Sequence, residues 1–318
     1  MQEIHSALQS LNKRMTRAAV LGPLFFLSKD RKIRLARWLR GREQCQKLSK
    51  ADCVIVSYGK SGRTWLRVML SRVYQIKYGL ARRHLIGFDN FYRMNRAIPK
   101  IFFTHDNYVK DYSGNVANKK DYYDKNVILL VRNPADVAVS QYFQWKHRMR
   151  AEKKELNKYP SHGADISMID FVMDEDAGLP KVVEFMNLWA DEMDKLKSAL
   201  IVRYEDLRAE TETVLSKVLD FMGTPTPSDE VKEAVTYASV ENMRQLEAKR
   251  VFWFAGGRMR AKDRNDPNSF KVRRAKVGGY RDYFEADEIA RIERYIREHL
   301  SPKYGYAEAA LPPRTATA

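Results

Sequence analysis

The sequence predicts an α/β fold, a single domain with a central, mainly parallel β-sheet flanked by helices. The first observation is a set of four short, unbroken apolar runs at 53–57, 101–105, 126–131 and 199–204. Strands that are buried on both faces of a parallel sheet have this pattern. The second observation is that stretches with helical periodicity separate the runs. Strands that alternate with helices build a parallel sheet.

Residues 1–50 are expected to form a basic amphipathic segment ahead of the domain, since only three acids occur there. In RKIRLARWLR, residues 31–40, apolar residues fall near helical spacing and arginines fill the other face. Such a helix can lie on an anionic membrane, and AAVLGPLFFL at 18–27 is too short to span one. Two interpretations stay open: residues 12–40 associate peripherally with the inner face of a membrane, or the helix packs on the domain.

The helices between the strands are predicted from apolar spacing. TWLRVMLSRVYQI at 64–76 repeats apolar residues at i, i+3, i+4 and i+7 from Leu66, and the next helix begins with Pro134, a favourable first residue. Further helices are expected at 180–197, 208–222 and 286–299. The domain is expected to cover 51–305, with a flexible tail over 306–318.

Composition limits the class of protein and its compartment. The net charge of +17 favours an acidic partner such as nucleic acid, an anionic membrane or a polyanionic small molecule. The only two cysteines, Cys45 and Cys53, indicate a reducing compartment rather than a disulfide framework. The sequence has no Cys/His cluster, so no metal site is expected. A cytoplasmic protein is predicted.

The stretch SYGKSGRTW at 57–65 indicates an anion-binding loop. It contains Gly-Lys-Ser, yet Val54 stands where a Walker A sequence has its first glycine. Two glycines allow a tight turn, and the start of the following helix presents backbone N–H groups to an anion. Lys60 adds a positive charge. By itself the motif is weak, because a glycine–serine turn with a lysine is usually only a turn.

A second candidate phosphate site follows the third apolar run, in VRNPADVAVS at 131–140. Arg132 emerges at the end of the predicted strand, and Ser140 lies nearly two turns into the next helix. A guanidinium group with a nearby hydroxyl suits a phosphate. Alone, Arg132 fits equally well as a structural ion-pair partner.

Together, SYGKSGRTW and VRNPADVAVSQYF resemble the cytosolic-type sulfotransferases, which use 3′-phosphoadenosine 5′-phosphosulfate (PAPS). The family patterns read approximately Y-P-K-S-G-T-T-W and R-N-P-x-D-x-x-V-S-x-Y. Looser matches occur in family order, with FFTHDN at 102–107, VRYEDL at 202–207 and RRAKVGGYRDYF at 273–284. The resemblance covers most of the chain. It implies a P-loop-like nucleotide-binding core, PAPS as co-substrate, and no metal.

The resemblance implies three catalytic residues, Lys60, His105 and Ser140. Lys60 would contact the bridging oxygen between phosphate and sulfate and neutralise charge on the leaving phosphate. His105 would be the general base that removes the acceptor proton, a task that suits imidazole. Ser140 would bind the 3′-phosphate of PAPS together with Arg132.

The resemblance also implies the set of PAPS contacts. In chain order they are Lys60, Ser61, Gly62, Arg63, Thr64, Trp65, Arg132, Ser140, Tyr204, Ser239, Arg273, Arg274 and Ala275. Thr64 and the loop amides would hold the 5′-phosphate, and Trp65 and Tyr204 would contact adenine. Arg273 and Arg274 would complete the clamp on the 3′-phosphate.

The chain departs from the family patterns at several positions. Gly59 replaces a proline and Arg63 replaces a threonine in the loop, and Phe103 replaces the lysine of the family's K-T-H-L-P segment. Asp106 is a candidate for tuning His105. The family's dimer motif would fall at 281–290, where its T-V pair is missing, so that mode of dimerisation is not predicted.

The acceptor is expected to be a hydroxyl or amine of a lipid, glycolipid, glycan or other small molecule. Its pocket is expected from the loops 82–100, 146–165 and 245–270. The apolar VFWFAGG at 251–257 is either a lid or part of the core.

Two other classes of function remain as alternatives at this stage. One is a P-loop kinase or NTPase, against which Val54 speaks, as does the run that leads to Arg132 where a Walker B strand has aspartate. The other is a non-catalytic nucleic-acid-binding protein, suggested by the net charge of +17 but lacking a recognisable motif.

Overall fold

The computed structural model describes residues 26–252, 259, 270 and 274–306, and contains one parallel sheet within them. Its strands are β1 (Cys53–Val56), β2 (Ile101–Thr104), β3 (Asn126–Val131) and β4 (Ser198–Arg203), in the order β2-β1-β3-β4. All neighbouring strands pair in parallel. The predicted α/β class and the four predicted strands are therefore confirmed.

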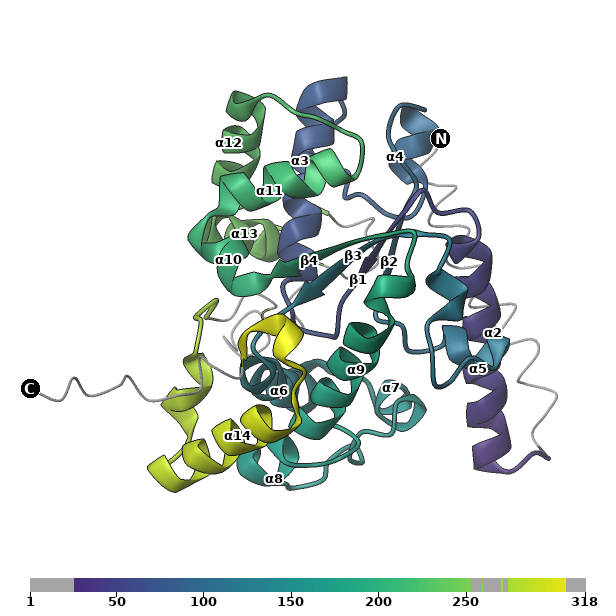
Figure 1. The fold of residues 1–318 in the computed structure, drawn as a ribbon, viewed down its shortest axis with the longest axis vertical. Helices are drawn as coiled ribbons and strands as arrows, with labels where there is room; N and C mark the ends of the chain where they lie inside the picture. Colours follow the sequence, from purple (N-terminus) through teal and green to yellow (C-terminus); the bar gives the residue numbers. More distant parts are fainter. Residues whose placement is uncertain (1–25, 253–258, 260–269, 271–273, 307–318) are drawn as a thin grey trace, which may run out of the picture.

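Alternating side chains of the strands pack into two cores on opposite faces of the sheet. Val54 and Val56 belong to one core and Ile55 to the other. Helices α6, α9 and α14 contribute to the first core, whereas α3, α11 and α12 contribute to the second. Figure 1 shows the resulting three layers, with the sheet between the two groups of helices.

The helices differ in length from 5 to 20 residues. The longer ones are α2 (Lys29–Leu48), α3 (Arg63–Tyr78), α6 (Pro134–Phe143), α9 (Leu179–Glu192), α11 (Thr211–Phe221), α12 (Ser228–Tyr237), α13 (Val240–Ala248) and α14 (Ala286–His299). The shorter ones are α4 (Asn90–Met94), α5 (Val109–Ser113), α7 (Ala151–Leu156), α8 (Met168–Val172) and α10 (Tyr204–Ala209). Single turns lie at η2 (Lys120–Tyr122), η3 (Gln144–Arg148), η4 (Met193–Lys195), η7 (Gly279–Tyr283) and η8 (Pro302–Tyr304).

Local sequence accounts for where several helices begin and end. The Asn133 side chain accepts hydrogen bonds from the Ala135 and Asp136 amides and caps α6, with Pro134 at its first position. Glu285 and Glu288 form a capping box at α14. The prediction of a single helix over 208–222 is wrong. Glu210, at φ −130° and ψ 58°, interrupts it and separates α10 from α11.

Helix α2 packs on the domain beside α5 (Figure 1). Arg37 pairs with Asp111 at 2.9 Å and donates to the Asn107 and Leu156 carbonyls at 3.0 and 2.8 Å. A Cβ on Gly41 would lie 2.3 Å from the Tyr108 carbonyl oxygen, so glycine permits this close approach. The packing interpretation therefore holds for α2, while residues 1–25 lie outside the described part.

The C-terminal end of the domain also packs on the rest of the fold. Tyr306, the first residue of the expected flexible tail, is buried, and its hydroxyl donates to Glu205 Oε2 at 2.5 Å. Residues 307–318 lie outside the described part of the chain. None of the helices in the described part is both long enough and apolar enough to cross a membrane.

Candidate active site

The loop between β1 and α3 is fixed by two residues in left-handed conformations. Gly62 has φ 93° at the N-cap of α3, and a Cβ there would lie 2.6 Å from Tyr204 Cδ2. Only glycine fits both requirements. Lys60 has φ 76° although it is not glycine. The loop therefore holds a conformation that non-glycine residues disfavour, as active-site loops often do.

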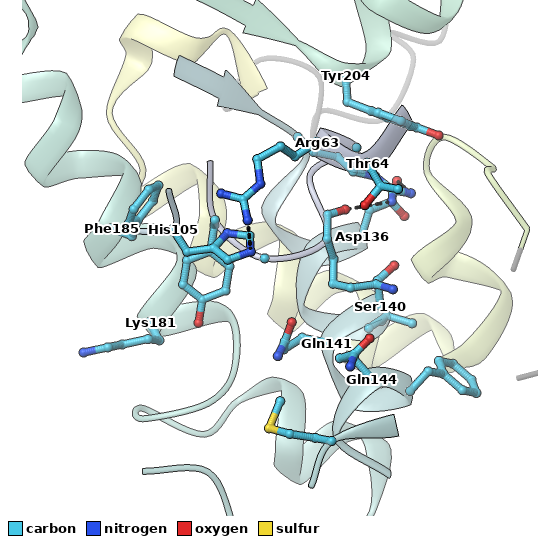
Figure 2. Close-up of a pocket in the computed structure, with 18 of the residues that line it drawn as sticks. Arg63, Thr64, His105, Asp136, Ser140, Gln141, Gln144, Lys181, Phe185 and Tyr204 are labelled. Atoms are coloured by element: carbon cyan, nitrogen blue, oxygen red, sulfur yellow. Dashed lines mark hydrogen bonds and ion pairs between the residues drawn. The ribbon is translucent and has the colours of Figure 1, made fainter. Parts of the chain in front are cut away.

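A cavity of about 610 Å³ opens beyond the carboxyl ends of the strands, where ligands of parallel sheets bind. Most of the predicted site residues line it. They are Lys60, Gly62, Arg63, Thr64, Trp65, His105, Arg132, Ser140, Tyr204, Arg274 and Ala275. Figure 2 shows part of this wall, with Arg63 beside His105 and with Ser140 on α6.

Three predicted contacts are not brought to the cavity wall in the described part. Ser61 is buried and does not line the cavity. Ser239 caps α13, where its hydroxyl accepts from the Asn242 amide at 3.3 Å, and its neighbours Ala238 and Val240 line the cavity in its place. Arg273 lies outside the described residues.

His105 at the end of β2 is held through both ring nitrogens. Nδ1 lies 2.7 Å from the Ser57 carbonyl oxygen, which can only accept, so Nδ1 carries a proton. Nε2 lies 2.6 Å from Nη2 of Arg63, which can only donate, so Nε2 is the acceptor (Figure 2). The pair of contacts selects the neutral tautomer with its lone pair on Nε2.

The carboxylate of Asp106 makes neither of the two hydrogen bonds to the ring of His105. It accepts from Lys119 Nζ at 2.6 Å and from the Tyr122 hydroxyl at 2.7 Å. All three side chains are buried, so the carboxylate belongs to an internal network. The residue in direct contact with His105 Nε2 is Arg63. Sequence reasoning missed this partnership because the two residues are 42 positions apart.

Arg132 lies over the ring of Tyr204, with its guanidinium carbon 4.5 Å from the ring centroid. It also donates to the Lys276 carbonyl at 2.8 Å and to Asp136 at 3.2 Å. Its Nε is buried and has no hydrogen-bond partner in the described part of the chain. A buried donor of this kind suits a phosphate oxygen as ligand.

Asp136 positions the segment that carries Arg274 and Ala275. Its carboxylate accepts from the Gly278 and Tyr280 amides at 2.9 and 3.0 Å. Asp136, which is buried in α6, therefore holds a loop that is more than 130 positions away in the sequence. This loop lies beside Arg132. Asp136 was not singled out from the sequence, although the R-N-P-x-D pattern contains it.

Arg274 and Ala275 reach the cavity in different ways. Arg274 pairs with Asp282 at 2.8 Å and donates to the Tyr283 hydroxyl at 3.0 Å. Ala275 has φ 55°, a left-handed conformation. Glycine adopts this conformation more readily than alanine, so Ala275 holds a strained backbone there.

Trp65 and Tyr204 form an aromatic corner at one end of the cavity. Their ring centroids are 6.0 Å apart at an interplanar angle of 67°. Trp65 Nε1 donates to the Ala238 carbonyl at 2.8 Å, and Arg208 lies over the Trp65 ring at 5.5 Å. This rigid corner can hold a planar base.

The opposite end of the cavity is built mainly from α5, α9 and the segment 148–159. Tyr58 packs against Phe185 at 5.4 Å, and Tyr159 accepts a hydrogen bond from Gln141 at 2.8 Å. The expected loop 146–165 contributes, but 82–100 provides no lining residue in the described part, so that expectation is wrong. Of 245–270, Phe270 lines the cavity, whereas Phe252 is buried in a core. The rest of VFWFAGG from 253 onward lies outside the described residues.

The fold and this cavity define an α/β nucleotide-binding protein with a P-loop-like anion site. The sulfotransferase domain family matches residues 50–303. The flavonol 3-sulfotransferase of Flaveria bidentis is 25% identical over 289 residues, covering 83% of this chain and 87% of that protein. Cytosolic sulfotransferase 10 of Arabidopsis thaliana is 22% identical over 284 residues, covering 79% and 78%.

Solved structures agree in fold. A mouse sulfotransferase complexed with PAP aligns with a TM-score of 0.57 at 20% identity, covering 85% of this chain and 94% of that one. Retinol dehydratase in a complex with retinol and PAP aligns with a TM-score of 0.52 at 17% identity, covering 79% and 81%. The chain therefore belongs to the sulfotransferase family and is a sulfotransferase. This assignment decides against the kinase and nucleic-acid-binding alternatives.

Proposed function

We propose that the protein transfers the sulfuryl group of PAPS in line to a hydroxyl or amine of a small-molecule acceptor, with His105 as general base. The observation that carries the proposal is the tautomer of His105, whose lone pair on Nε2 faces the cavity shared with the Lys60 loop. A general base needs an unprotonated nitrogen that can come within reach of the acceptor proton.

The described residues fit PAPS as co-substrate. The start of α3 and Thr64 suit the 5′-phosphate, and the corner of Trp65 and Tyr204 suits adenine. The unsatisfied Nε of Arg132 and the hydroxyl of Ser140 suit the 3′-phosphate. PAPS would supply the sulfuryl group and a phosphate leaving group, so no metal is required by this scheme.

The proposed roles follow from these positions. As the acceptor oxygen attacks sulfur, Nε2 of His105 takes its proton, and the bond from sulfur to the bridging oxygen breaks. The electron pair stays on the leaving phosphate, where Lys60 neutralises the developing charge. The Ser57 carbonyl keeps its hydrogen bond to Nδ1 and stabilises the imidazolium. Arg63 leaves Nε2 when the acceptor hydroxyl arrives, because both groups donate to the same lone pair.

The test separates nucleotide recognition from transfer. Calorimetric titration should show adenosine 3′,5′-bisphosphate (PAP) binding more tightly than ATP or DNA at moderate salt. Radiolabelled PAPS should then label acceptors from phenolic, glycan or lipid pools. Preference for ATP, or salt-sensitive binding of DNA alone, would contradict the assignment of the cavity.

We also propose peripheral association of the N-terminal segment with an anionic membrane surface. Support comes from the exposed residues Arg31, Arg34, Trp38 and Arg42, whose spacing places them along one side of α2. Each basic residue near such a surface contributes about 1 kcal/mol.

This association predicts cosedimentation with phosphatidylserine vesicles at low salt, and loss of it in the variant Arg31→Glu/Arg34→Glu. The control Arg294→Glu/Arg297→Glu carries the same charge change on exposed positions of α14. Intact protein that stays in the supernatant, or equal behaviour of both variants, would show that the segment does not bind membranes.

A further inference from the structure

The acceptor end of the cavity has more cationic than anionic side chains. Lys110 from α5, Lys153 from α7 and Lys181 from α9 line it, with Lys119 and Arg37. Asp176 also lines the cavity, and the three other acids on this wall are used in ion pairs. They pair as Asp106 with Lys119 at 2.6 Å, Asp111 with Arg37 at 2.9 Å, and Glu184 with Lys181 at 2.7 Å.

Besides Lys158, the lysines left over from this pairing are Lys110 and Lys153. No carboxylate of the described residues forms an ion pair with either ammonium group within 4.0 Å. Desolvation and the charges of Lys119 and Lys181 lower the pKa of Lys110. Lys153 is an exposed residue of α7 that lines the same cavity, with Arg63 and Arg40 as neighbouring charges. Both lysines therefore stand among like charges that a bound anion would offset.

Both lysines line the same cavity as the proposed base. Lys110 interacts with the charge of Asp106, the residue after His105. Lys153 interacts with the charge of Arg63, whose Nη2 is 2.6 Å from His105 Nε2. Tyr58 and Phe185, which also line the cavity, provide an aromatic surface. An acceptor bound there would share the cavity with His105 and both lysines.

We propose that the acceptor carries a carboxylate, phosphate or sulfate group in addition to the hydroxyl or amine that is sulfated, and that Lys110 and Lys153 recognise this group. The inference rests on the proposed function of the cavity. The proposed phosphate contacts are the Lys60 loop, Arg132 and Ser140, so these lysines are not assigned to the phosphates of PAPS. Cations beside His105 also offset the repulsion between an anionic acceptor and PAPS.

The test compares probes that differ only in charge, bound to protein saturated with PAP. The phenolic probes are 3-(4-hydroxyphenyl)propionate, its neutral methyl ester, and the cation tyramine. The sugar probes are methyl glucuronoside and methyl glucoside. The anion of at least one series should bind about ten- to a hundredfold more tightly than its neutral counterpart, as charge-assisted hydrogen bonds predict. The preference should weaken with added salt.

Two variants and a control locate the effect. The double variant Lys110→Gln/Lys153→Gln should lose the preference, and Lys110→Glu/Lys153→Glu should prefer tyramine over the propionate. Lys217→Gln, an exposed lysine of α11 away from the cavity, should behave as the wild type. Absence of an anion preference in both series, or its persistence in the double glutamine variant, would overturn the inference. PAP titration of the same samples distinguishes this outcome from failure of the proposed function, because the proposed function predicts that PAP still binds.

Discussion

At the scale of single residues, the site depends on a few side chains whose partners are far away in the sequence. Lys60 keeps a left-handed backbone at φ 76°, which costs about 1–3 kcal/mol for a residue other than glycine. In the proposed mechanism its charge is needed mainly when negative charge develops on the leaving phosphate. A substitution of Lys60 can therefore remove the charge of the side chain without removing the backbone strain.

The variant Lys60→Ala should lower turnover by about 10²–10³-fold, the usual loss for a preorganised electrostatic contact. PAP affinity should change much less, and far-ultraviolet circular dichroism should remain that of the wild type. Steady-state kinetics with radiolabelled PAPS measure the effect, with Lys217→Ala as a control on an exposed surface. Turnover close to wild type with every acceptor would remove Lys60 from the mechanism.

The variant His105→Asn should keep PAP affinity and lower transfer by about 10²–10⁴-fold, since it removes the general base. With an alcohol acceptor the wild-type rate should fall as the solution is acidified, because protonation occupies Nε2. His299→Asn is the matched control, on an exposed histidine at the end of α14. A flat pH profile for the wild type would argue for a different base.

The variant Arg132→Ala should weaken PAP far more than adenosine 5′-monophosphate, which lacks the 3′-phosphate. That group carries about −1.5 to −2 charges at neutral pH, and it would lose the donor that Nε offers. Calorimetric titration of both nucleotides gives the ratio. Equal losses would mean that Arg132 only supports Tyr204 and the Lys276 carbonyl.

At the scale of elements, α6 acts as the organiser of the nucleotide side. Its first turn holds the loop before η7 through Asp136, and its second turn presents Ser140 to the cavity. Helix capping by Asn133 fixes where this helix begins. Because the strands are parallel, their carboxyl ends all lie on the same side of the sheet. The elements from the two faces of the sheet meet there.

The variant Asp136→Asn should weaken PAP and destabilise the fold by about 1–3 kcal/mol, as the loss of charged, buried hydrogen bonds predicts. The amides of Gly278 and Tyr280 would compete for a single acceptor oxygen. Urea unfolding and PAP titration measure the two effects. Asp170→Asn, at an exposed position of α8, should change neither, and an Asp136→Asn protein with wild-type PAP affinity would disprove the organising role.

At the scale of the whole molecule, α2 belongs to the folded domain although sequence composition sets it apart. Leu48 enters the core of α6 and α9, and Trp38 packs on Tyr112 at a centroid distance of 5.2 Å. Arg37 joins α2 to the segments around Asn107 and Leu156. Helix α2 and the rest of the domain therefore share a core.

Removal of residues 1–48 should consequently lower the melting temperature by about 5 °C or more, since each lost kcal/mol shifts a domain of this size by about 2–4 °C. Removal of residues 1–25 should leave it close to that of the full chain. Differential scanning calorimetry of the three proteins decides the point. An unchanged melting temperature after removal of 1–48 would show that α2 contributes nothing to the domain.

The sequence by itself determined the layers of the fold and most of the residues that line the cavity. Unbroken apolar runs identify strands buried on both faces, and Gly62 and Pro134 mark the local backbone of the loop and of α6. These signals are local, so one chain segment suffices to recognise them. The break at Glu210 was missed, because apolar periodicity continues from α10 into α11.

Tertiary structure alone decided which side chains meet across the cavity. The contact of Arg63 with His105, the hold of Asp136 on Gly278, and the pairing that leaves Lys110 and Lys153 over all join separate elements. Periodicity predicts α9 but not which of its side chains reach the cavity, and it gives no signal for the short helix α5. Such contacts depend on the relative positions of packed helices, and these positions follow from the complete core, because close packing fixes each helix against all its neighbours.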